Sequence, residues 1–208
     1  MGTVLCAISN IEISKDVVLA NKDVYLEQLK ALQLKHTLTP TYDENGVFKA
    51  YVLDTGDWTY DLPTTYDEET ASWVPDSDYP EIIYFDSPFA FSVGVYASCL
   101  EVSTIYRYGF LYQLKDLDSL QEFRQALFDI ISIFGGTEVL YLTDQSEPVL
   151  SDYLYNWVLE GAAYTAVKQD IILKGIPLLT EYTALDENRS LNAGSEIMLD
   201  DFQDLNGS

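Results

Sequence analysis

Three consecutive stretches in the middle of the chain have the residue pattern of β-strands, and they constrain the fold more than any other feature. They cover residues 82–85, 89–98 and 100–114, and all three are rich in β-branched and aromatic residues. In the third stretch, every second residue from Val102 to Phe110 falls on one face. Because successive side chains of a strand point to opposite faces and the connections are short, we predict antiparallel strands at the centre of a sheet.

The spacing of apolar residues predicts further elements on both sides of this sheet centre. Strands are expected at residues 4–9, 11–19 and 138–142, and a hairpin is expected from residues 37–42 and 47–55 around the Asn45-Gly46 turn. Helices are expected from Asn21 to about Lys35, from Asp116 or Asp118 to Gly135, and over residues 149–160 and 165–174. These elements predict an α+β fold, with a mixed, mainly antiparallel sheet and helices packed on one face.

The predicted domain organisation is a single α+β domain over residues 1–182, followed by an acidic C-terminal tail over residues 183–208. Within the domain, residues 56–80 lack hydrophobic periodicity and contain three prolines, seven acids, three tyrosines and two tryptophans. A loop of this length inside a compact domain usually has a function or stays mobile. We therefore predict a long acidic loop with a functional role in this interval.

The net charge of −23 is concentrated in one part of the chain. Residues 43–86 contain twelve acids against one lysine, whereas residues 1–42 balance four acids against four lysines. A field of this sign repels nucleic-acid phosphates and anionic lipid, and it attracts cationic partners. We therefore expect a basic protein partner, with no direct nucleic-acid binding and no membrane association.

The N-terminal sequence lacks the basic flank and apolar run of a secretory signal, and it contains no stretch long enough for a transmembrane helix. The two cysteines, Cys6 and Cys99, lie in apolar, strand-like stretches. We expect both to be buried, reduced thiols, so the predicted location is cytoplasmic.

Few residues are available for catalysis or metal binding. His36 is the only histidine, and its place at the end of a predicted helix favours a solvated side chain over a general base. One histidine and two separated cysteines lack the ligand spacing of a zinc site, and no glycine-rich phosphate-binding motif is present. We therefore expect no metal and no cofactor. A cluster of three aspartates, Asp54, Asp57 and Asp61, keeps a carboxylate-using hydrolase open as an alternative.

The acidic part of the chain also carries a collective signal, because its carboxylates alternate with tyrosines and tryptophans. Aromatic side chains bury a large rigid area when a partner binds, and nearby carboxylates complement arginine and lysine. The expected partner contacts are Asp57, Trp58, Tyr60, Asp61, Tyr66, Glu68, Glu69, Trp73, Asp76 and Asp78. The alternative is that these rings belong to the core and that the acids only keep the protein soluble.

The C-terminal tail combines apolar and acidic residues in a second pattern of this kind. Ile197, Phe202 and Leu205 are spaced so that they can share one face of a helix, as in acidic segments that fold into a groove of a partner. The expected docking residues are Ile197, Leu199, Asp200, Asp201, Phe202 and Leu205. The same segment could instead pack on its own domain or fray.

These features predict a non-enzymatic acidic binding protein that inhibits or neutralises a basic partner. Two forms fit the charge pattern: an immunity-type protein, and a nucleic-acid mimic that blocks a nucleic-acid-binding site. The alternatives are a hydrolase that uses carboxylates, and an adaptor that docks into a larger complex through its C-terminal tail.

Overall fold

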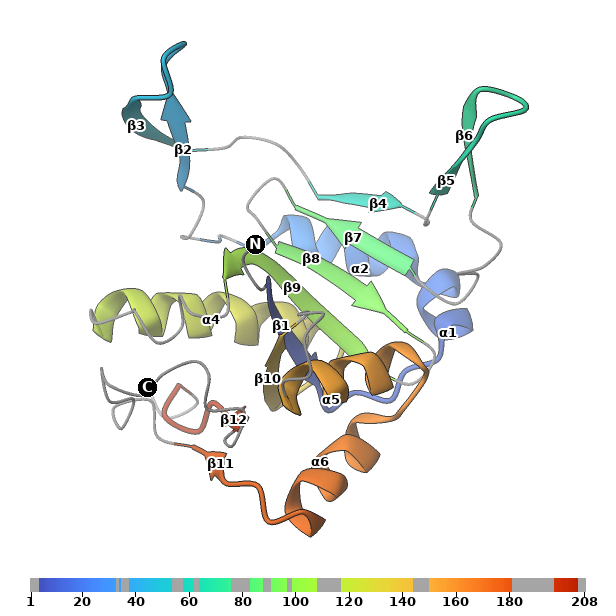
Figure 1. Ribbon diagram of the computed structural model, residues 1–208, viewed down its shortest axis with the longest axis vertical. Coiled ribbons are helices and arrows are strands. Elements are labelled where there is room, and N and C mark those ends of the chain that lie inside the picture. Colours follow the sequence, from blue (N-terminus) through green and yellow to red (C-terminus); the bar gives the residue numbers. More distant parts are fainter. Residues whose placement is uncertain are drawn as a thin grey trace.

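The computed structural model describes residues 4–32, 34, 38–53, 58–61, 64–75, 83–87, 91–96, 99–107, 117–143, 150–180 and 197–205. Across these residues, eight strands form one sheet in the order β11-β12-β10-β1-β9-β8-β7-β4 (Figure 1). The strands are β1 (Val4–Ser9), β4 (Thr59–Asp61), β7 (Ile83–Asp86), β8 (Phe91–Val95), β9 (Leu100–Arg107), β10 (Val139–Thr143), β11 (Leu178–Leu179) and β12 (Ile197–Asp200). Neighbouring strands are antiparallel except β11 and β12, which are parallel. The predicted α+β fold with a mixed, mainly antiparallel sheet is confirmed.

Helices cover both faces of this sheet. The helices α1 (Lys15–Ala20), α2 (Lys22–Lys30) and α4 (Leu117–Ile133) pack on one face, and α5 (Leu150–Leu159) and α6 (Tyr164–Leu173) pack on the other. Strand β1 gives the reason, because its side chains enter two hydrophobic cores. Leu5 and Ala7 belong to the core beneath α1, α2 and α4, whereas Cys6 and Ile8 belong to the core beneath α5 and α6. A strand that is apolar on both sides requires cover on both, so the structure adds a second helical layer to the expected one-face arrangement. Within the described residues, no helix combines the length and apolar character needed to cross a membrane.

Most of the predicted elements are present. Residues 4–9 and 138–142 correspond to β1 and β10, and the three later helices correspond to α4, α5 and α6. The predicted hairpin consists of β2 (Leu38–Tyr42) and β3 (Phe48–Leu53), and Gly46 in its turn has a φ of 76°. Glycine adopts this left-handed conformation without steric cost, which is why the turn can be recognised from sequence. Residues 108–116, which include the end of the third strand-like stretch, lie outside the described residues.

Residues 11–19 do not form the predicted strand. Ser14 is instead the N-cap of α1, and its Oγ accepts a hydrogen bond from the backbone N–H of Val17. Asn21 precedes α2, and its side-chain amide donates to the carbonyl oxygen of Val17 at 2.8 Å. These caps, together with the burial of Val18 in the core, outweigh the β propensity of the stretch.

The interval 56–80 is not a loop throughout. It contains β4, which is an edge strand of the main sheet, and a separate hairpin of β5 (Thr64–Asp67) and β6 (Ser72–Pro75). The side chains of this hairpin are mostly exposed, so its strands lack the alternation of apolar residues that reveals a half-buried strand. Residues 56–57, 62–63 and 76–80 lie outside the described residues.

Part of the segment predicted as a tail is a strand of the domain. β12 lies between β10 and β11, and all four of its residues are buried. This finding corrects the helical face expected for the tail. A strand covered on both faces reads as a continuous apolar run, and residues 197–199 have that character. Residues 183–196 lie outside the described residues.

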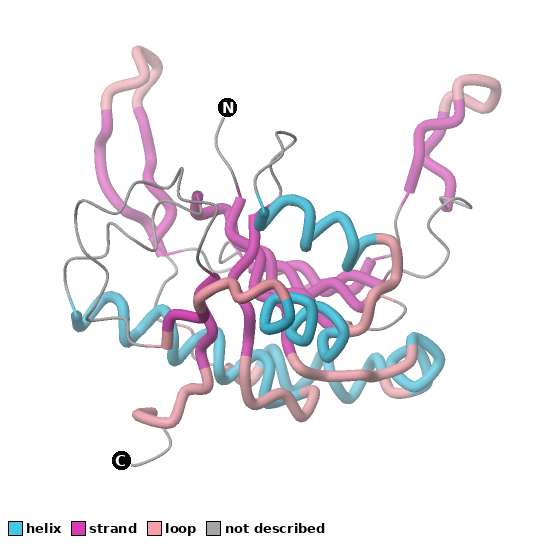
Figure 2. The backbone as a smooth tube through the Cα atoms, turned by 60° about the horizontal axis from the view of Figure 1, so that its bottom comes forward, coloured by secondary structure: helices cyan, strands magenta, loops and turns pink. Residues whose placement is uncertain are grey.

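The hairpins β2–β3 and β5–β6 form two small sheets that are separate from the main sheet. Figures 1 and 2 show both hairpins extending away from the main sheet on the same side of the molecule. The architecture therefore consists of a layered body with two projecting arms.

Candidate partner-binding surface

The β5–β6 hairpin presents an aromatic pair to solvent. Tyr66 on β5 and Trp73 on β6 are opposite each other in register, so their side chains share one face of the hairpin. The rings meet edge to face with their centroids 5.6 Å apart, and the two residues remain 50% and 69% exposed. This contact stabilises the hairpin and leaves a rigid aromatic surface accessible to a partner.

Hydrogen bonds to one carboxylate fix the turn between these strands. Asp67 Oδ1 accepts from the backbone N–H of Glu69 at 2.9 Å, and Asp67 Oδ2 accepts from Thr70 Oγ1 at 2.8 Å. Thr70 Oγ1 also shares a hydrogen bond with Ser72 Oγ at 2.8 Å. The Thr70 hydroxyl and the Glu69 amide hold the pKa of Asp67 below its usual value, so this carboxylate is charged at neutral pH. Ala71 completes the turn with a φ of 49°, which non-glycine residues rarely adopt.

Negative charge lies next to the aromatic pair, at the turn of the same hairpin. Glu68 and Glu69 are exposed at the tip of the hairpin, and residues 50–106 contain no lysine, arginine or histidine. A local excess of carboxylates creates a potential that attracts cationic groups. The rings add faces on which a cation can lie, and the carboxylates add acceptors for charged N–H donors. This surface is therefore suited to the side chains of arginine and lysine.

Four of the predicted partner contacts lie together on the hairpin. They are Tyr66, Glu68, Glu69 and Trp73. Asp57, Asp76 and Asp78 lie outside the described residues, as do His36 and the Asp54 of the hydrolase alternative. The candidate surface consists of the aromatic pair and the acidic tip, because the structure brings these residues to one place.

The remaining predicted contacts lie at β4. Trp58, directly before this strand, is 2% exposed and belongs to the core, so its predicted role as a surface contact is wrong. Tyr60 is partly buried, with its ring 5.6 Å from the ring of Phe85 and the Lys22 ammonium 4.9 Å from the ring centroid. Asp61 ends the strand. Sequence reasoning cannot separate the inward rings from the exposed ones here, because both kinds alternate with acids.

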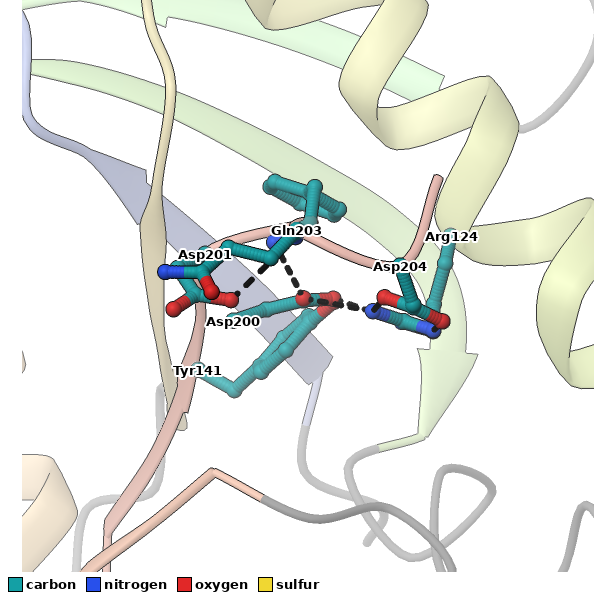
Figure 3. Close-up of polar contacts among 7 residues, drawn as sticks. Arg124, Tyr141, Asp200, Asp201, Gln203 and Asp204 are labelled. Atoms are coloured by element: carbon teal, nitrogen blue, oxygen red, sulfur yellow. Dashed lines mark hydrogen bonds and ion pairs between the residues drawn. The ribbon is translucent and has the colours of Figure 1, made fainter. Parts of the chain in front are cut away.

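A buried ion-pair network fixes the C-terminal segment to α4 (Figure 3). Arg124 is 4% exposed, and its guanidinium binds two carboxylates, each through two hydrogen bonds. Nε and Nη2 donate to Asp200 at 2.9 and 2.8 Å, and Nη1 and Nη2 donate to Asp204 at 2.7 and 2.6 Å. The Tyr141 hydroxyl also donates to Asp200, at 3.1 Å. Hydrogen bonds from Arg124 hold the pKa of Asp204 below its usual value.

Phe202, between the two aspartates, anchors the same segment in the core. Its side chain is fully buried, and its ring centroid lies 5.2 Å from that of Phe128. Its φ of 52° is left-handed, and its backbone N–H donates to Asp200 Oδ1 at 3.0 Å. This backbone conformation costs about 1–2 kcal/mol, and burial of the ring, at about 1.5–3 kcal/mol, offsets that cost.

Most of the residues that were expected to dock into a partner therefore pack within the protein's own domain. Ile197, Leu199, Asp200 and Phe202 are buried, and Asp201 and Leu205 are partly exposed. Of the possibilities that the sequence leaves open, packing on the same domain is the one present in residues 197–205.

Glu101 is a buried carboxylate that sequence reasoning misses, because a single acid within a strand has no recognisable pattern. It is 1% exposed, the Tyr155 hydroxyl donates to both of its oxygens at 3.3 Å, and the Ser103 hydroxyl also donates to it. Burial, with a smaller contribution from Glu101, raises the pKa of Cys99 to about 12. A thiol with this pKa is protonated at neutral pH and is a poor nucleophile. We therefore interpret the cluster as a polar part of the core.

Within the described residues, no group of three or more histidine, cysteine, aspartate or glutamate side chains is arranged to hold a metal ion. Comparisons with protein-family models, with curated proteins and with solved structures found no match to this chain. A proposal for function therefore depends on the residues of this chain alone.

Proposed function

We propose that this protein is a non-enzymatic acidic binding protein that inhibits or neutralises a basic protein partner, with the β5–β6 hairpin as its main contact. One observation carries the proposal: the exposed Tyr66–Trp73 pair stands beside the fixed, charged turn at Asp67. Two exposed aromatic rings in contact form a contiguous apolar patch, which is more informative than a single exposed apolar residue, and acidic neighbours select for cationic partners.

The parts of the hairpin contribute differently to binding. A cation over an exposed aromatic ring is stabilised by about 0.5–1 kcal/mol. A single exposed ion pair contributes about 0.2–1 kcal/mol, so the carboxylates act mainly as a group and on the rate of association. Truncation of Trp73, which has the larger and more exposed ring, is therefore expected to have the largest single effect.

The fixed turn lowers the entropy that binding costs. The hydrogen bonds of Asp67 already hold the backbone at Glu69 and the hydroxyl of Thr70 in place. A partner therefore does not have to order this tip, as it would have to order a disordered acidic segment. Such preorganisation favours the hairpin over a flexible charged tail as the contact.

The form of inhibition that we propose is immunity-type, in which the acidic surface covers a basic site of the partner. The negative potential of this surface would also attract a partner whose basic site normally binds nucleic acid, since carboxylates can take the place of phosphate charges. Arg124 and Phe202 hold residues 200–204 in their own domain, and this argues against an adaptor that docks through the same segment.

The affinity of the full chain for an oligo-arginine peptide, measured by isothermal titration calorimetry, tests this proposal. We expect Trp73→Ala to weaken binding about two- to fivefold, which corresponds to the loss of one cation–ring contact of about 0.5–1 kcal/mol. Leu173→Ala is the matched control, because Leu173 is 77% exposed on α6 and should not contribute. Equal losses in the two variants, or equal wild-type affinity for an oligo-glutamine peptide of the same length, would contradict the proposal.

A further inference from the structure

The two projecting hairpins carry the same four-residue sequence at the same place. Residues 41–44 and residues 65–68 both read Thr-Tyr-Asp-Glu. In each hairpin, this sequence runs from the end of the first strand into the turn. The chain thus contains a short local repeat, although its longer sequence has no fixed period.

The repeated sequence has the same local structure in both hairpins. Asp43 Oδ1 accepts from the backbone N–H of Asn45 at 2.9 Å, and Asp67 Oδ1 accepts from that of Glu69 at 2.9 Å. In the first hairpin, Asp43 Oδ1 also accepts from the N–H of Val47 at 2.9 Å. Each aspartate therefore fixes its turn by bonding the amide two residues ahead.

The structure of the turn accounts for the aspartate in the repeated sequence, but it does not account for the tyrosine before it or the glutamate after it. A turn of this type requires the carboxylate and backbone groups only. Tyr42 and Tyr66 precede the aspartates and are 60% and 50% exposed. Glu44 and Glu68 follow the aspartates and are exposed. Each tip therefore presents an accessible ring and an exposed carboxylate on either side of the aspartate that fixes the turn.

Both tips also have a second exposed apolar side chain, namely Val47 in the first hairpin at 59% and Trp73 in the second at 69%. The hairpins extend from the same side of the molecule in two views, so a single flat or concave surface can meet both (Figures 1 and 2). The exposed Lys49 on β3 reduces the negative charge of the first arm, whereas the second arm has the additional carboxylate of Glu69. The second arm is therefore the stronger contact for a cation.

We propose that the two tips are copies of one contact element, and that a basic protein partner binds both at once through two cationic sites on one surface. This inference rests on the proposed function and deepens it, because it specifies how the partner's charges are arranged. Linking two contacts makes the second one intramolecular, which raises affinity about 10²–10⁴-fold when the geometry permits both.

Two oligo-arginine probes test the inference on the full chain. One contains a single arginine run, and the other contains two such runs joined by a glycine-serine linker of variable length. A flexible linker of n residues spans roughly 5–6 Å × √n, so a series of lengths covers the possible separations of the tips. We expect the two-run peptide to bind the wild type at least about tenfold tighter than the single-run peptide at the best linker length.

Variants of the first tip should remove this gain and leave single-run binding almost unchanged, because the second tip is intact. Tyr42→Ala removes the ring, and Glu44→Lys reverses a charge without altering the hydrogen bonds of the turn. The second variant keeps the test valid if the first disturbs the hairpin. Val24→Ala and Glu27→Lys are matched controls on α2, where both residues are exposed.

Three outcomes would overturn the inference. A gain of less than about tenfold at every linker length would show that the two runs do not bind both tips at once, since two runs alone give a statistical advantage of only about twofold. A larger gain that survives both first-tip variants would arise elsewhere on the acidic surface. In both cases the loss of single-run binding in Trp73→Ala would still support the proposed function. The absence of any single-run binding would remove both proposals together.

Discussion

Arg124 shows how a chain with a net charge of −23 keeps a cation inside its core. The guanidinium satisfies Asp200, which is 1% exposed, and Asp204, whose side chain is 54% exposed. A buried ion pair adds little net stability relative to apolar residues, but loss of one partner leaves a buried charge. The three side chains are therefore best understood as a unit that fixes the position of the C-terminal segment.

Arg124→Met is expected to lower the free energy of unfolding by about 3–5 kcal/mol, because Asp200 remains buried without its partner. Urea unfolding measures this loss. The additional change Asp200→Asn should restore part of it by removing the charge.

Lys168→Met removes a more exposed ion pair and therefore serves as the comparison for Arg124→Met. The Lys168–Glu138 pair has an N–O distance of 2.6 Å, but its side chains are 28% and 22% exposed. Solvent reduces the contribution of such a pair, so we expect a loss of about 1 kcal/mol. Similar losses in Lys168→Met and Arg124→Met would show that the Arg124 network does not act as a buried charge cluster.

At the scale of elements, the β5–β6 hairpin and β12 make opposite contributions to stability. The hairpin pairs only within itself, whereas β12 lies between two strands of the main sheet. A hairpin that has exposed side chains and does not pair with the main sheet can contact a partner without a change in the fold. An element that adds a strand to the sheet and places Phe202 in the core contributes to the stability of the whole domain.

Replacing residues 64–75 with a short glycine-serine linker should therefore change the midpoint of thermal unfolding by only a few degrees. Deleting residues 197–208 should lower it by about 10 °C or more, since each kcal/mol corresponds to about 2–4 °C for a chain of this size. Circular dichroism during heating measures both midpoints. An equal decrease in the two variants would contradict this division between binding and structural elements.

The elements that could be predicted from sequence are those with local signals. Strand alternation in 100–107 and the glycine after α4 are visible within a few residues. The place of β12 in the sheet could not be predicted, because it depends on pairing with β10 and on Arg124, which lies 76 residues away from Asp200 in the sequence. Trp58 and Trp73 likewise look the same in sequence, and only the tertiary fold places one inside and the other on an arm.

At the scale of the whole molecule, the layered body and the projecting arms have separate roles. The sheet and its two helical layers contain both described cores, and the arms extend from one side of that body. Each charged side chain counts once in the net charge, wherever it lies. Only the charges near a bound cation contribute strongly to its binding. Salt screens exposed charges beyond about 10 Å at 0.1 M, so carboxylates at the arm tips should dominate binding at physiological salt.

The most direct test of this account compares two variants with the same net charge. Glu68→Gln with Glu69→Gln removes two charges from the tip of β5–β6 and leaves Asp67 in place, and Glu27→Gln with Glu160→Gln removes two exposed charges from the body. Affinity for the oligo-arginine peptide at about 0.15 M salt should decrease severalfold in the first variant and little in the second. Equal decreases in the two variants would show that the protein attracts cations through its total charge and not through the hairpin.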